Sequence, residues 1–168
     1  DEAFCFLYED NLDYLRQSGC ELTYFSPLKD SSLPDNIDGL LLYGGYPEIH
    51  AEELSENISM REDIAGRIQS GLPCIAECGG FLYLHEYLET PDKEKYPMAG
   101  IIRGTGYNAG KLQRFGYMSV KAVKNTMLAD KNQSFRAHEF HYWNSDCPGS
   151  DYEVIKACLL YTSPSPRD

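Results

Sequence analysis

The sequence is poor in basic residues and has no long hydrophobic run. It carries 15 lysines and arginines against 26 aspartates and glutamates, a formal net charge of −11 at pH 7. Nucleic acid and anionic membranes would repel so acidic a chain, so neither is an expected partner. No stretch of about 18 apolar residues could span a bilayer. The first residues, DEAFCFLYED, lack the basic start and the cleavable apolar segment of a signal peptide, so we expect a cytoplasmic protein.

Motifs for nucleotide and metal binding are also missing. No G-x-x-x-x-G-K-[ST] loop is present, so we do not expect this chain to bind ATP through a phosphate loop. Its 6 cysteines are scattered, and Cys74 and Cys78 do not form the C-x-x-C pairs typical of zinc sites, so we expect no metal centre. Most of the cysteines lie in apolar surroundings that are typical of reduced core thiols.

The pattern that is present is that of one α/β domain. A chain of 168 residues can bury a core without help from metals or disulfides. Short apolar runs predict strands at 3–8, 21–25, 38–43 and 73–76. Apolar residues at helical spacing predict helices at 11–18, 52–70 and 81–88. Strands that alternate with helices indicate a doubly wound, mostly parallel sheet with helices on both faces.

The second half of the chain changes character. Residues 96–123 are rich in glycine, tyrosine and β-branched residues, which predicts antiparallel strands or a mixed extension of the sheet. Residues 158–168, CLLYTSPSPRD, form a Ser/Pro tail that fits neither a strand nor a helix. We therefore expect the domain to cover residues 1–157 and the tail not to be part of the native domain.

Cys78 stands at the joint between a predicted strand and a predicted helix, in CIAECGGFLYL. Ligands of open α/β sheets gather at this end of the strands. Gly79 and Gly80 are the small neighbours that a nucleophile on a tight turn needs. We expect the helix N-terminus to lower the pKa of the thiol and the N–H of Gly79 to help bind an oxyanion. The alternative is that Cys78 is a small core residue.

A second glycine turn, YGGYPE at 43–48, follows another predicted strand. In a parallel sheet it would lie beside Cys78, so the N–H of Gly45 is expected to complete an oxyanion hole with that of Gly79. The alternative is an ordinary tight turn, which also favours paired glycines.

The motifs GGYPE, AECGGF and HEFHY are specific in combination. Together with longer segments such as AFCFLYEDNLDYL and RAHEFHYWNSD, they resemble the glutamine amidotransferase domain of cobyrinic acid a,c-diamide synthases. That domain belongs to the glutaminases with a Cys-His-Glu triad, and the resemblance covers residues 1 to about 157. It implies the flavodoxin-like fold of class I glutamine amidotransferases.

The resemblance also implies a reaction. Cys78 would attack the side-chain amide of glutamine, form a glutamyl thioester and release ammonia, and water would then yield glutamate. The ammonia would pass to an ATP-dependent synthetase domain on the N-terminal side, which uses ATP and Mg²⁺ to amidate carboxylates of cobyrinate in cobalamin biosynthesis. No cofactor is implied for the glutaminase domain itself. We therefore expect this chain to be a C-terminal part of a larger enzyme.

The histidine that activates the cysteine lies, in the family pattern, in a Tyr-x-His segment near the end of the domain. That segment is absent, so we expect the domain to be C-terminally incomplete. His141 in RAHEFHYW is the candidate base within this chain. The same tract could instead be a strand that shapes the site or contacts the corrin substrate. His50 and His85 are expected to be ordinary surface or helix residues.

Tyr46 and Glu48 are the remaining candidates for binding glutamine. Tyr46 would form a wall of the pocket or serve only in packing. Glu48 and Glu77 would orient glutamine or position the synthetase domain, although a carboxylate on a loop is more often simply solvated.

Other functions stay open at the level of sequence. Nickel-sirohydrochlorin a,c-diamide synthases share this domain, and the sequence does not separate the two substrates. A catalytically incompetent fragment that keeps the fold is a second possibility. A cysteine hydrolase of the α/β-hydrolase kind is less well supported, because Ala76 replaces the first glycine of the G-x-[SC]-x-G elbow.

Overall fold

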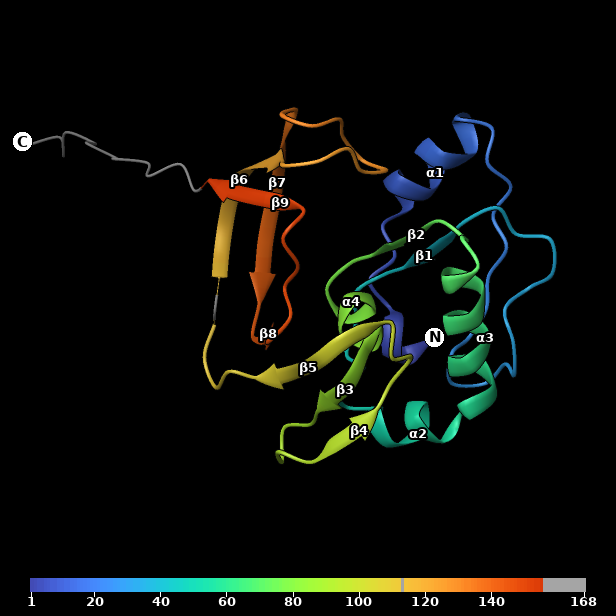
Figure 1. Cartoon of the computed structure of the whole chain (residues 1–168). Helices are drawn as coiled ribbons and strands as arrows, with labels where there is room; N and C mark the ends of the chain where they lie inside the picture. Colours follow the sequence, from blue (N-terminus) through green and yellow to red (C-terminus); the bar gives the residue numbers. More distant parts are fainter. Residues whose placement is uncertain (113, 156–168) are drawn as a thin grey trace, which may run out of the picture. The chain divides into compact units, whose positions relative to one another are not determined.

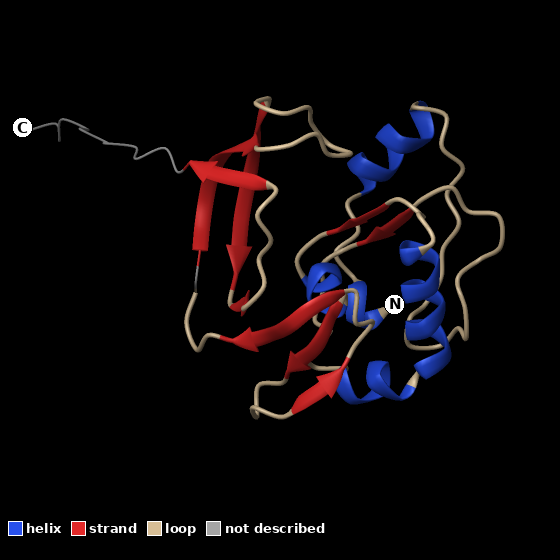
Figure 2. Ribbon diagram, in the orientation of Figure 1, coloured by secondary structure: helices blue, strands red, loops and turns tan. Residues whose placement is uncertain are grey.

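The computed structural model describes residues 1–112 and 114–155, which form a mixed α/β structure with parallel and antiparallel sheets (Figures 1 and 2). The chain divides into two compact units. Of the described residues, the first unit contains 1–110 and 143–147, and the second contains 111–112, 114–142 and 148–155. The predicted tail at 158–168 lies outside the described residues. Within the described part, no helix is both long enough and apolar enough to cross a membrane.

Among the described residues, all the helices belong to the first unit. They are a 3₁₀ helix at Glu2–Phe4, α1 at Glu9–Gln17, α2 at Ala51–Glu56, α3 at Ile58–Gln69 and α4 at Gly79–Tyr83. The single helix predicted at 52–70 is wrong, because Asn57 divides it into α2 and α3. The side-chain oxygen of Asn57 accepts the N–H of Met60 at 3.4 Å and so caps α3. Its amide donates to the carbonyl oxygens of Pro27 and Asp30, which fixes the break.

The first unit contains two sheets. In the smaller sheet, β1 (Leu40–Leu42) pairs in parallel with β2 (Cys74–Ala76). The larger sheet has the order β4-β3-β5-β8, with strands at Lys95–Pro97, His85–Glu89, Ile102–Asn108 and Trp143–Ser145. Its β3 and β5 are parallel and its other pairs are antiparallel.

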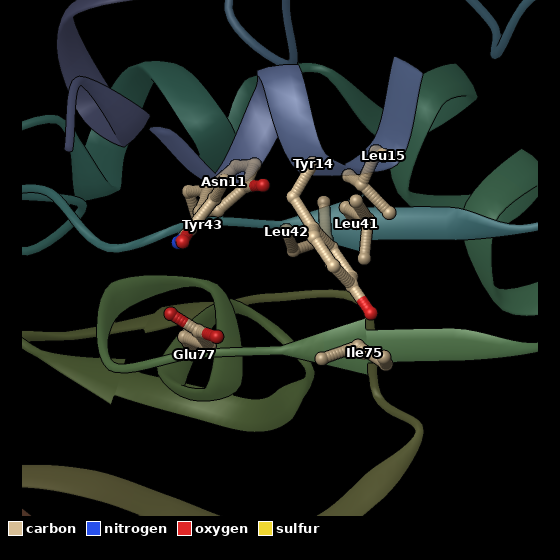
Figure 3. A pocket seen from close by; sticks show the side chains of 8 residues that line it. All are labelled: Asn11, Tyr14, Leu15, Leu41, Leu42, Tyr43, Ile75 and Glu77. Atoms are coloured by element: carbon tan, nitrogen blue, oxygen red, sulfur yellow. The ribbon is translucent and has the colours of Figure 1, made fainter. Parts of the chain in front are cut away.

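The core of the first unit lies on one side of the β1–β2 pair. Leu40 and Leu42 are buried together with Met60 and Ile64 of α3. Leu41, between the two buried leucines, points to the opposite face, where α1 lies (Figure 3). This alternation places a helix on each side of the parallel pair.

Three further predicted elements of the first unit are wrong. Residues 3–8 begin in a 3₁₀ helix and then continue without strand pairing. Only isolated hydrogen bonds, such as the one that Phe6 N–H donates to Gly44 O, link them to the glycine turn. Residues 21–25 are irregular and pair with no strand of the described chain. The helix predicted at 81–88 ends at Tyr83, and the residues that follow become β3.

The second unit is an antiparallel sheet with the order β7-β6-β9, formed by Ser134–His141, Arg114–Ala122 and Tyr152–Ile155. Side chains alternate along β7 between exposed and partly buried. Met118, Val120 and Ala122 of β6 are buried. The prediction of antiparallel strands or a mixed extension of the sheet for residues 96–123 is confirmed, because β6 is antiparallel to both of its neighbours whereas β5 is parallel to β3 and antiparallel to β8.

Candidate functional site

Cys78 has an unusual backbone conformation between the end of β2 and the start of α4. Its φ is 48° and its ψ is −110°. Positive φ values are uncommon for residues other than glycine, and such strained positions gather at functional sites. The strand-to-helix joint predicted for Cys78 is therefore confirmed as a tight turn.

The glycines after Cys78 are required by close packing. A β-carbon on Gly79 would lie 2.8 Å from Cδ of Pro47, and one on Gly80 would overlap the carbonyl oxygen of Leu42. Both glycines are buried. Any larger residue would therefore displace either the YGGYPE loop or β1 from the thiol turn.

The two glycine turns lie side by side, as predicted. A β-carbon on Gly44 would lie 3.3 Å from Cβ of Cys78, and one on Gly79 would lie 3.1 Å from the nitrogen of Gly45. The N–H of Gly79 interacts with the thiol of Cys78, whereas the N–H of Gly45 meets no backbone acceptor within the described chain. The arrangement brings both predicted oxyanion donors to one place, and their catalytic role stays a prediction.

The pKa of Cys78 moves in the direction opposite to the one expected from the sequence. Loss of hydration among the surrounding protein atoms raises the pKa, and the N–H of Gly79 lowers it by less. The carboxylates of Glu48 and Glu77 raise it further. The residue nevertheless remains exposed to solvent. By contrast, burial raises the pKa of Cys74 to about 11, which leaves that thiol unreactive at neutral pH.

The expectation that Glu48 is solvated is wrong. Glu48 is only 9% exposed, and burial raises the pKa of its carboxyl group. Tyr46, two residues earlier, is 48% exposed, and its ring stands edge-on to Phe6 with centroids 5.1 Å apart. Both candidates for substrate binding are thus carried by the loop that approaches Cys78.

His85 was expected at the surface or in a helix, and this is wrong. It is fully buried at the start of β3. Its Nδ1–H donates to the carbonyl of Phe81 at 2.9 Å, so Nε2 accepts the hydroxyl of Ser145 at 2.7 Å. Both ring nitrogens are occupied, and burial lowers the pKa of the ring. His85 therefore has a structural role here.

The candidate base His141 lies on β7, in the second unit. It shares a face of the sheet with Glu139, and its Nε2 lies 3.9 Å from Oε1 of that residue. Cys78 belongs to the first unit, so the pairing of the two residues stays a prediction. His50, in the first unit, lies at the start of α2 with Nδ1 3.4 Å from a carboxylate oxygen of Glu53.

A groove of about 200 Å³ runs between α1 and the β1–β2 pair (Figure 3). Its apolar part is formed by Tyr14, Leu15, Leu41, Leu42 and Ile75, and its polar part by Asn11, Tyr43 and Glu77. Glu77 and Tyr43 immediately precede the thiol turn and the glycine turn, so the polar end adjoins the candidate site. Apart from the helical spacing of residues 11–18, no sequence pattern predicts this groove.

Metal binding finds no support in the described residues, among which no cluster of three or more His, Cys, Asp or Glu side chains could hold an ion.

Comparison with protein families shows which family the chain belongs to. Residues 1–157 match the model of the CobB/CobQ-like glutamine amidotransferase domain. The chain belongs to this family. The resemblance stated from the sequence is thereby confirmed.

Relatives of this glutamine amidotransferase domain are named cobyrinate a,c-diamide synthase. The protein from Clostridium acetobutylicum is 46% identical over 162 residues, which are 96% of this chain and 35% of that protein. The protein from Dehalococcoides mccartyi is 44% identical over 142 residues, which are 84% of this chain and 31% of that protein. The chain therefore spans about a third of the length of these relatives.

Proposed function

We propose that this domain is the glutaminase part of an ATP-dependent cobyrinate a,c-diamide synthase and supplies ammonia for amidation of corrin carboxylates. The observation that carries the proposal is the strained turn at Cys78, which stands beside the N–H groups of Gly45 and Gly79. Acyl transfer from an amide needs an accessible nucleophile and hydrogen-bond donors for the oxyanion. The exposed thiol on its tight turn would be the nucleophile, and the two adjacent N–H groups would be the donors.

The reaction follows from these parts. The sulfur of Cys78 attacks the side-chain amide carbon of glutamine, and the N–H groups of Gly45 and Gly79 stabilise the oxyanion that forms. Collapse of this intermediate breaks the C–N bond, and the leaving nitrogen takes up a proton and departs as ammonia. Water then cleaves the thioester, which gives glutamate and restores the thiol. His141 is the candidate acceptor for the proton of the thiol, and Tyr46 and Glu48 are the candidates for holding glutamine.

The complete enzyme would contain a synthetase domain that precedes this one and uses ATP and Mg²⁺. The share of the relatives that this chain covers, 31–35%, leaves room for such a domain. The name of the relatives supports cobyrinate as the acceptor of ammonia. The glutaminase domain itself needs no cofactor for the steps above.

We further propose that the domain has the doubly wound, flavodoxin-like arrangement and that residues 1–157 of this chain belong to it. The parallel pair β1–β2, with α1 and α3 near opposite faces, supports it. Residues 21–25, which have a strand-like sequence and no paired neighbour in the described chain, would then join the same sheet. The described cysteines are free, in keeping with a reducing compartment such as the cytoplasm.

The test is release of glutamate and ammonia when the purified chain is incubated with L-glutamine. We expect equal amounts of the two products, and none from the Cys78→Ala variant. Equal release from both proteins would contradict the proposal. Folded protein that releases neither product would favour a second candidate, a domain without glutaminase activity of its own, to which the raised pKa of Cys78 also points.

A further inference from the structure

Glu48 is a buried carboxylate that lacks a cationic partner. It is 9% exposed, and its carboxylate accepts a hydrogen bond from its own backbone N–H. No lysine, arginine or histidine of the described residues forms an ion pair with it, although the more distant His50 exerts a weak attraction. An unpaired buried charge is costly, so such a group is normally completed by a cation.

The loop that carries Glu48 holds it close to the reactive thiol. Pro47 is fully buried and packs against Gly79, the residue that follows Cys78. The charge of Glu48 acts on the thiol of Cys78, and more strongly than the charge of Glu77 does. A cation that pairs with Glu48 would therefore arrive beside the sulfur that attacks the substrate.

We propose that Glu48 binds the α-ammonium group of glutamine, so that the domain selects free L-glutamine over glutamine that is acylated at its α-nitrogen. The proposal rests on the glutaminase function proposed above. The ammonium nitrogen of glutamine lies four single bonds, about 5 Å, from the amide carbon that Cys78 attacks.

Pairing with the substrate has a consequence for the nucleophile. In the free protein the carboxylate of Glu48 disfavours the thiolate of Cys78. An ammonium group beside Glu48 cancels that charge, so binding of the correct substrate lowers the pKa of the thiol that will attack it. Glu48 is thus a specificity-determining residue that also couples binding to activation.

The experiment compares two alkylating analogues of glutamine. 6-Diazo-5-oxo-L-norleucine (DON) carries a free α-ammonium group, and its N-acetyl derivative carries none. In each reaction a C–S bond forms at the diazo carbon, the thiol proton is transferred to that carbon, and N₂ leaves. The rate of Cys78 labelling is read from intact mass for the wild type, for Glu48→Gln and for Glu52→Gln, which removes an exposed carboxylate of α2 as a control.

We expect the wild type and Glu52→Gln to react with DON roughly tenfold to hundredfold faster than with the N-acetyl derivative. This is the range expected when one hydrogen bond between charged groups is lost. Glu48→Gln should lose most of this preference. The bulk of the acetyl group is the same for every protein variant, so the change in preference between variants isolates the charge of Glu48. Glu48→Asp, which keeps the carboxylate, should restore part of the preference.

Other outcomes would overturn the assignment. If Glu48→Gln keeps the wild-type preference, another group binds the ammonium, and loss of the preference in Glu77→Gln would identify that carboxylate. A Glu48 whose partner is a basic residue of a synthetase domain would also leave the preference intact. Iodoacetamide labelling of Cys78 without any reaction with DON would instead contradict the proposed glutaminase function itself.

Discussion

Pro47 and Gly79 are packed so closely that a β-carbon on the glycine would lie 2.8 Å from Cδ of the proline. This contact joins the YGGYPE loop to the turn that carries Cys78. The nucleophile, the candidate oxyanion donors and the buried Glu48 are thereby held by two loops with little freedom to move independently.

Gly79→Ala should therefore damage the site more than its small size suggests. We expect a loss of about 1–3 kcal/mol in the free energy of unfolding, because the added methyl group overpacks the contact with Pro47. Labelling of Cys78 by DON should also slow. The matched control is Gly66→Ala in α3, where a β-carbon meets nothing within 4 Å and should stabilise the helix by about 0.5–1 kcal/mol. Urea denaturation measures both changes, and equal effects in the two variants would contradict the packing argument.

Ser145→Ala should destabilise the first unit. The hydroxyl of Ser145 donates to Nε2 of the fully buried His85, so its removal leaves a buried acceptor without a partner. The expected cost is about 1–3 kcal/mol. Ser31→Ala, at an exposed position of the segment that precedes β1, should change the free energy of unfolding by less than about 0.5 kcal/mol. A Ser145 variant as stable as the wild type would show that the hydrogen bond contributes nothing.

His85 should also make stability depend on pH. Burial lowers its pKa in the folded protein, while the unfolded chain has the ordinary value of about 6.5. Below that value the unfolded chain binds the proton more readily, so the contribution of neutral His85 is lost as the pH falls toward the folded pKa. The carbonyl of Phe81 and the charge of Asp146 oppose part of the shift.

Urea denaturation at pH 7.5 and pH 5.5 measures this effect. The wild type should lose more stability on acidification than His85→Gln does, because the glutamine has no proton to bind. The difference between the two proteins removes the contribution of the other titrating groups they share. Identical losses would mean that His85 does not titrate differently in the two states.

The thiol of Cys78 should react with iodoacetamide faster as the pH rises through and beyond the usual range for cysteine, because its pKa is raised. Glu48→Gln and Glu77→Gln should each shift the pH–rate profile to lower pH, since each removes a negative charge that disfavours the thiolate. Peptide mapping at several pH values follows Cys78 alone. An unchanged profile in both variants would contradict the electrostatic coupling.

The part of the fold nearest the site could be predicted from the sequence. A short apolar run followed by Cys78 and two glycines predicts a strand, a tight turn and a helix. This is the structure found at β2, Cys78 and α4. The meeting of Gly45 with Gly79 followed from the rule that parallel strands end at the same edge of a sheet.

Other features depended on distant neighbours that local patterns do not contain. Residues 21–25 have the composition of a strand but find no strand to pair with in the described chain. The sequence pattern predicts a solvated Glu48, whereas the residue is buried on a loop that packs against Gly79, a neighbour distant in the sequence. The local pattern predicts His85 within a helix. Its hydrogen-bond partner Ser145 is 60 residues away in the sequence, so local spacing contains no sign of that contact.

Treatment of the purified chain with DON, followed by intact mass and peptide mapping, tests the central claim most directly. If Cys78 is the nucleophile of a glutamine site, a single adduct will form, it will map to Cys78, and the Cys78→Ala variant will gain none. Adducts on the exposed Cys5 or Cys20, or no adduct on a folded chain whose Cys78 still reacts with iodoacetamide, would contradict it.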